Sequence, residues 1–140
     1  MNDLIERIEA ASGPDRALDH EIYEYLGSPI VRMVSATTHG TDLVNWAPFY
    51  TASVDAALTL VPEGWWLAGL HFCHPDFRSE QDKEWCAELA GPVTWAVIDR
   101  EVGEEPLFEH VCASAATPAL ALSASAMKAD AYLKETNNAE

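Results

Sequence analysis

Apolar and charged residues alternate at helical spacing near the N-terminus of the chain. Leu4, Ile5, Ile8 and Ala11 recur beside acidic residues, which predicts a short amphipathic helix with its charges toward solvent. A second helix is predicted directly after it, from the apolar positions Leu18, Ile22, Tyr25 and Leu26. We expect Ser12 to be the N-cap of this helix, with Asp15 completing a capping box, and Gly27 to end it.

The chain closes on another helical pattern. Thr117 is the expected N-cap and Pro118 the expected first helical residue. The apolar stripe of this helix is Leu120, Ala124, Met127 and Ala131. Its many Ala and Ser residues predict close packing against a sheet.

The middle of the chain, residues 50–65, carries the densest local signals. Ser53 is the expected N-cap of a short helix, and the Pro62–Gly64 segment is typical of a turn into a strand. The residues expected on one side of this helix are Val54, Ala57, Leu58 and Val61. We interpret this stretch as a packing centre.

Strands are predicted around this centre. Residues 65–73 form one strand with two largely apolar faces, so both faces are expected to be covered. Residues 93–99 and 107–113 are predicted to form a hairpin across a turn at 102–106, and residues 74–88 a loop with one helical turn around 81–90. Residues 28–49 fit either a hairpin or a surface excursion. The predicted fold is therefore α+β, with an antiparallel sheet and helices at both ends and in the middle.

Composition limits the functional classes. The 140 residues suit a single domain (1–140), and 49% hydrophobic residues with five Trp favour a folded globule. Eight basic and 23 acidic residues give a formal net charge of −15, so direct nucleic-acid binding is not expected. The acidic surface is either solubilising or complementary to a basic groove of another protein. No signal peptide or membrane-spanning run is seen, which predicts a cytoplasmic protein with three reduced cysteines.

Three blocks together carry a resemblance to a known family. Tyr50–Trp65, Ala116–Leu122 and Ile5–Asp19 are similar to the small phage and prophage proteins of the phage ABA sandwich domain family. The chain departs from that family at residues 28–49 and 74–91. The resemblance implies an antiparallel sheet of three or more strands sandwiched between helices, in α/β/α layers. It implies no catalytic residues.

Two His-x-Cys pairs, His71–Cys73 and His110–Cys112, are the main candidates for metal ligands. One zinc ion needs its donors within about 2.3 Å, whereas residues two apart on a strand lie about 7 Å apart and a further strand would separate the pairs. Buried cysteines and hydrogen-bonded histidines are therefore expected, with no metal and no cofactor.

Other reactive groupings lack a recognisable signature. Cys73 with His74, or Cys86 with His71, could pair as nucleophile and base, but neither lies in a strained elbow or a Gly-rich turn. The acidic loop 76–88 lacks the spacing of an EF-hand. The aromatic residues Trp46, Phe49, Tyr50 and Trp85 suit either an interface or the cover of a sheet edge. No catalysis is expected.

The leading functional hypothesis is a non-enzymatic phage accessory protein that inhibits a host defence system, in the manner of an anti-CRISPR protein. Its partner would be a host protein with a basic, nucleic-acid-binding surface, and no membrane is involved. The expected partner-binding residues are Asp76, Glu80, Asp82, Glu84, Trp85, Glu88, Glu101, Glu104 and Glu105. The alternative is a small-ligand binder, such as a sponge for a signal nucleotide held by Arg32, Arg78 and Arg100, or a homo-oligomeric accessory protein.

Overall fold

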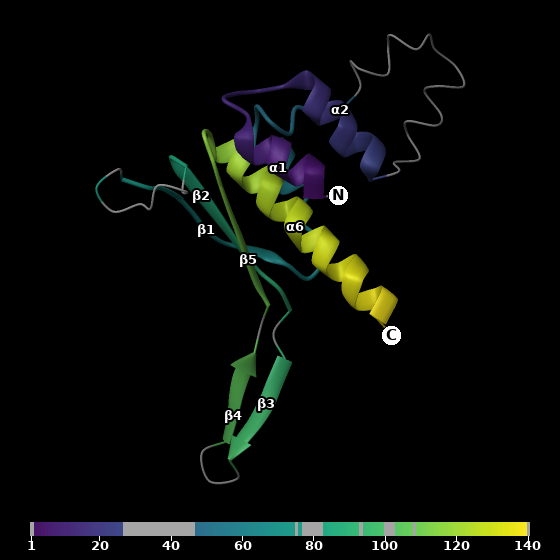
Figure 1. Cartoon of the computed structure of the whole chain (residues 1–140). Helices are drawn as coiled ribbons and strands as arrows, with labels where there is room; N and C mark the ends of the chain where they lie inside the picture. The colour runs from purple at the N-terminus through teal and green to yellow at the C-terminus, as the bar shows by residue number, and fades with distance from the viewer. Residues whose placement is uncertain are drawn as a thin grey trace.

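A computed structural model describes residues 2–26, 47–74, 76, 83–92, 94–99, 103–107 and 109–139; of residues 94–99, 103–107 and 139 it describes the backbone only. Figure 1 shows the arrangement of the elements. Its helices are α1 (Asn2–Ala10), α2 (Arg16–Tyr25), α5 (Val54–Leu58) and α6 (Pro118–Ala139). Its strands are β1 (Trp66–Phe72), β2 (Trp85–Ala90), β3 (Thr94–Asp99), β4 (Gly103–Leu107) and β5 (His110–Ala115).

Three of the described helices, α2, α5 and α6, begin at capping side chains. Thr117 Oγ1 accepts from the N–H of Leu120, and Ser53 Oγ accepts from the N–H of Ala56, so the predicted caps of α6 and α5 are confirmed. The expected cap of α2 is wrong. Asp15, rather than Ser12, precedes α2, and its carboxylate accepts from the N–H groups of Ala17 and Leu18. A carboxylate at this position also stabilises the positive end of the helix dipole.

An antiparallel sheet with the strand order β1-β2-β5 packs against the helices, which confirms the predicted α+β class. Helix α6 contacts all three strands, and α1 contacts α6 and β5 (Figure 1). The first half of α6 is buried almost all round, from Ala119 to Met127. Its Ala and Ser side chains allow this close approach, as predicted. The face of the sheet that carries Ala87 and Leu89 is buried in the same core as residues of α6.

Strand β1 is an edge strand, and the prediction that both of its faces are covered is wrong. None of its seven residues is buried, and Trp66 and Phe72 are 42% and 52% exposed. A register shift between Leu67 and Gly69 breaks the simple alternation, so Leu67 and Leu70 both pack against the core.

The strands predicted after residue 74 also differ from those in the structure. Residues 85–90, predicted as loop and helical turn, form the central strand β2. The partner of β3 is β4, in the segment predicted as a turn, whereas β5 pairs with β2. Figure 1 shows the β3–β4 hairpin projecting away from the helices as an arm. Its base is closed by a hydrogen bond from the Gly91 N–H to the Glu109 carbonyl (2.7 Å).

Candidate functional site

Strand alternation gives the three-stranded sheet a second face, called the open face below because the described helices pack on the opposite side. On β2, Ala87 and Leu89 are buried against the helices, so Cys86 and Glu88 point to the opposite face. Residues paired across antiparallel strands share a face. The neighbours that share this open face are Trp66 and His71 of β1, and His110 and Cys112 of β5. With Cys73, two residues beyond His71, the open face carries all three cysteines of the chain.

Three of these side chains converge at one end of the open face. One ring nitrogen of His71 and the Sγ atoms of Cys73 and Cys86 all lie within 4.8 Å of one another. His71 lies directly opposite Cys86 in the register. Cys73 is held beside them because its N–H donates to the Glu84 carbonyl (2.6 Å), which continues the pairing of β1 with β2.

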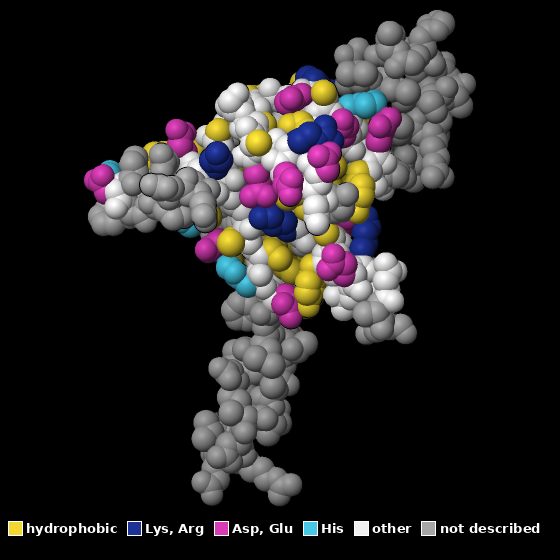
Figure 2. Space-filling view, viewed as in Figure 1, with side chains coloured by type: hydrophobic (Ala, Val, Ile, Leu, Met, Phe, Trp, Pro, Cys, Tyr) yellow, Lys and Arg dark blue, Asp and Glu magenta, His cyan; other side chains and the backbone are white. Residues whose placement is uncertain are grey.

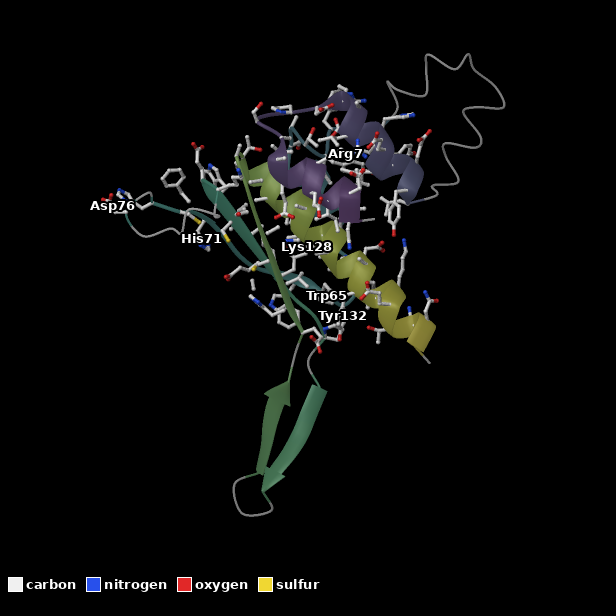
Figure 3. All side chains as sticks on the ribbon, in the orientation of Figure 1. Arg7, Trp65, His71, Asp76, Lys128 and Tyr132 are labelled. Atoms are coloured by element: carbon white, nitrogen blue, oxygen red, sulfur yellow. The ribbon has the colours of Figure 1, made fainter. Side chains whose placement is uncertain are left out.

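The cluster lies at the far end of β1 from the aromatic core. Figure 3 shows His71 toward the end of the strand that leads to Asp76, and Trp65 and Tyr132 together at the other end beside α6. The two aromatic rings there pack edge to face, with centroids 5.9 Å apart. His71 is exposed and both cysteines of the cluster are partly exposed free thiols, so the expectation of buried cysteines is wrong.

Burial, together with smaller contributions from Cys73 and Cys112, raises the pKa of the Cys86 thiol to about 11. The thiol of Cys86 therefore holds its proton near neutral pH while nothing binds it. Although Cys86 and His71 are adjacent, as a nucleophile and base would be, this environment does not activate the sulfur for attack.

Glu88 brings a carboxylate close to the cluster. Gly69, opposite Glu88 on β1, makes room for it, since a Cβ at Gly69 would lie 3.2 Å from Glu88 Oε2 and 3.9 Å from His71 Nδ1. On its other side, Glu88 Oε2 lies 3.9 Å from Nε2 of His110. The carboxylate of Glu88 thus lies on the open face near His110 and opposite Gly69.

The predicted partner-binding residues do not form one patch. Asp76 is exposed beside His74, and Glu84 is exposed before β2. Trp85 lies on the helix-facing side of β2, where its ring packs against Phe72 (5.6 Å) and the core, whereas Glu88 lies on the open face. The predicted residues on the arm, Glu104 and Glu105, pair with Val97 and Ala96. Outside the described residues lie Glu80, Asp82 and Glu101, and the candidate ligand-binding residues Arg32, Arg78 and Arg100.

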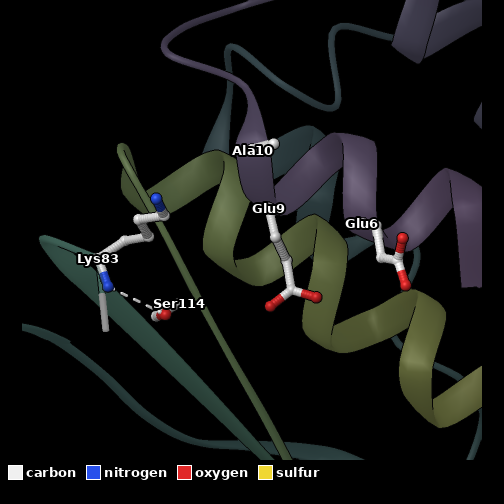
Figure 4. Close-up of a pocket in the computed structure, with 5 residues that line it drawn as sticks. All are labelled: Glu6, Glu9, Ala10, Lys83 and Ser114. Atoms are coloured by element: carbon white, nitrogen blue, oxygen red, sulfur yellow. Dashed lines mark hydrogen bonds between the residues drawn. The ribbon is translucent and has the colours of Figure 1, made fainter. Parts of the chain in front are cut away.

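An open depression of about 280 Å³ lies between α1 and the end of the sheet, lined by Glu6, Glu9, Ala10, Lys83 and Ser114. Figure 4 shows the two carboxylates on α1 across from Lys83, whose N–H donates to Ser114 Oγ (3.1 Å). Glu9 is already paired with Lys128 (3.3 Å). These groups do not converge on a common point, so the depression offers no built binding site.

The sequence placed His71 and Cys73 on one face of a strand and paired Cys86 with His71 only as a candidate nucleophile and base, so it did not combine the three as one ligand set. The two His-x-Cys pairs are separated by a strand, as expected, because β2 lies between β1 and β5. That intervening strand supplies Cys86. The available signal was the alternation in Cys86-Ala87-Glu88-Leu89, which places small or apolar residues on one side and Cys and Glu on the other.

No protein-family model, curated protein or solved structure matches this chain significantly. The resemblance to phage ABA sandwich proteins therefore stays a prediction. Within the described ranges, no helix combines the length and the apolar character needed to cross a membrane.

Proposed function

We propose that this protein acts without catalysis, by binding a partner protein through an acidic surface on its sheet and arm. The observation that carries the proposal is that acidic residues of the helices pair with Lys and Arg, whereas the described acidic residues of the sheet do not. In the described part of the chain, ion pairs with Lys or Arg all lie on the helices: Arg7 with Asp3 and Glu21, Arg16 with Asp19, Lys128 with Glu9, and Lys134 with Asp130.

The acidic groups of the sheet have a different environment. Asp76 and Glu88 lie within 4 Å of histidine side chains, which carry charge only when protonated. Figure 2 shows acidic and basic side chains interspersed over the face that carries α1 and α6. With a formal net charge of −15, the uncompensated surplus is therefore expected away from the helices. Such a surface favours fast, salt-sensitive association with a basic partner.

The arm strengthens this proposal. A two-stranded hairpin is marginally stable on its own, and one that projects from a domain is well placed to contact another protein. Strand β4 carries Glu104 and Glu105 on this arm. The more specific form of the proposal, an anti-CRISPR-like inhibitor that occupies a nucleic-acid-binding surface of a host defence complex, depends on the resemblance to phage proteins.

The test begins with affinity capture of the tagged protein from a bacterial host, at low and at moderate salt, with mass spectrometry of the bound proteins. The expected result is one stoichiometric partner with a basic surface whose binding weakens as salt rises. A captured complex is then compared with the variant Asp76→Asn/Glu84→Gln/Glu104→Gln/Glu105→Gln, which should bind at least about tenfold more weakly if each charge contributes a few tenths of a kcal/mol.

The matched control is Glu24→Gln/Asp55→Asn/Glu63→Gln/Glu135→Gln, which removes the same amount of charge from exposed positions of the helices and the turn before β1. It should bind as the unmodified protein does. Equal weakening by both variants would show that only net charge matters and would remove the site assignment. Capture of no partner would favour a small ligand or self-association.

A further inference from the structure

We propose that His71, Cys73 and Cys86 form a binding site for a thiophilic divalent metal ion, of which Zn²⁺ fits best. The site lies on the open face of the sheet and does not depend on the partner binding proposed above. His71 and Cys86 are directly paired across β1 and β2, and Cys73 continues this pairing through the hydrogen bond from its N–H to the Glu84 carbonyl. The backbone therefore fixes all three attachment points before any metal arrives.

The distances suit one ion. In a tetrahedral zinc site with Zn–S bonds of about 2.3 Å, neighbouring ligand atoms are about 3.8 Å apart. The ligand atoms of the cluster lie within 4.8 Å of one another. Side-chain rotation by about 1 Å closes this difference without any movement of the strands. Imidazole with two thiolates is a ligand set typical of Zn²⁺ and disfavours Mg²⁺ and Ca²⁺, which prefer oxygen.

The surroundings also favour a cation over a purely structural role. Cysteine is usually among the most buried residues, yet here all three cysteines lie on the face that the described helices leave open. Packing against a core does not explain their position. Glu88, which lies opposite Gly69 on the same face, adds a carboxylate to the surroundings of the cluster.

The ion would have a structural consequence. Strand β1 is an edge strand without a single buried residue, and its far end is held by backbone pairing with β2 and by the contact of Phe72 with Trp85. A metal shared by His71 and Cys73 of the edge and Cys86 of the central strand would fasten that end. Three protein ligands leave the fourth position open, as in zinc sites that accept a further ligand.

The test uses the full chain, stripped of metal with a chelator and kept reduced, and titrated with Co²⁺ as a spectroscopic substitute for Zn²⁺. We expect one Co²⁺ per chain, with thiolate-to-cobalt charge-transfer absorption and visible bands of tetrahedral coordination. Zn²⁺ should displace the Co²⁺ stoichiometrically and raise the Tm. Absence of Co²⁺ binding to the reduced, folded protein would overturn the proposal. It would also be overturned if Cys73 and Cys86 formed a disulfide with each other and bound no metal in either redox state.

Matched variants locate the site. Cys86→Ser and His71→Ala should each lower Zn²⁺ affinity by at least about 100-fold, because each removes a direct ligand. Cys112→Ser and His110→Ala remove the same side-chain types from β5 on the same face and should leave the affinity within about threefold of the unmodified value. All four changes lie on partly or fully exposed side chains, and circular dichroism checks that each variant is folded. Equal loss in the β5 variants would overturn the assignment to these three residues.

Discussion

Tyr50 shows how one buried group makes the stability of this protein depend on pH. Its side chain is 4% exposed, and burial raises its pKa to about 12, with smaller contributions from Tyr23 and Asp19. The folded state therefore keeps the phenol protonated where the unfolded chain, with a pKa near 10, has already lost the proton. The stabilising contribution is complete below pH 10 and disappears as the pH rises toward 12.

We expect the free energy of unfolding to fall by about 2 kcal/mol between pH 10 and pH 12 through Tyr50 alone, because its pKa differs by about two units between the folded and unfolded states. Urea denaturation across this range measures the loss. Tyr50→Phe has no proton to lose and should show a smaller decrease relative to its own value at pH 8. An identical decrease in both proteins would assign the alkaline sensitivity to other groups.

Single residues also show how far the sequence could identify the candidate site. His71 and Cys73 could be recognised because spacing of two on a strand places them on one face. Cys86 could be named only as one candidate partner of His71, because its place in the cluster depends on the β1–β2 register, which pairs the two residues. The register between two strands is set by the folded sheet, and the six residues of β2 do not by themselves indicate which residue of β1 each of them pairs with.

At the scale of elements, helix signals were easier to read than strand signals. The caps Ser53 and Thr117 act locally, through a side chain and an N–H three residues away, so the sequence contains the whole interaction. Strand β2 contains two Ala, one Leu and one Glu, all of which favour helices in isolation. Its state is decided by pairing with β1 and β5 on both sides, which overrides this propensity.

The packing centre predicted at residues 50–65 is joined to α2 by one buried carboxylate. Asp19 is 1% exposed; its Oδ1 accepts from the N–H (2.7 Å) and the hydroxyl (2.8 Å) of Thr51. Its Oδ2 pairs with Arg16 Nη1 (2.9 Å), and Arg16 Nη2 donates to the Ala47 carbonyl (2.8 Å). One side chain thus satisfies groups from two segments more than 30 residues apart.

Asp19→Ala should lower the free energy of unfolding by about 3 kcal/mol, since it leaves a partly buried guanidinium and a buried N–H without their carboxylate. Chemical denaturation measures the change. Asp3→Ala is the matched control, because Asp3 also pairs with an arginine, Arg7, but is 82% exposed; we expect a change within about 0.5 kcal/mol. Similar losses for both variants would contradict the structural role of Asp19.

At the scale of the whole molecule, three features of the surface are separated in space. The described ion pairs of Lys and Arg lie on the helices, the open face of the sheet carries the cysteines, and β4 of the arm carries acidic residues away from both. Figure 1 shows that the arm leaves the sheet between β2 and β5. Its two strands pair with each other, so the sheet β1-β2-β5 is complete without it.

Replacing residues 94–107 with Asn-Gly should therefore leave a folded core, because this turn can join the ends of the arm above the Gly91–Glu109 hydrogen bond. The Tm should change by less than about 5 °C, equivalent to about 1 kcal/mol for a domain of this size, and Co²⁺ binding should be retained. Partner capture should fall at least as far as in Glu104→Gln/Glu105→Gln, which removes the charges and keeps the arm. Full partner binding by the shortened protein would place the interface on the sheet alone, and loss of Co²⁺ binding would show that the arm supports the β1–β2 pairing.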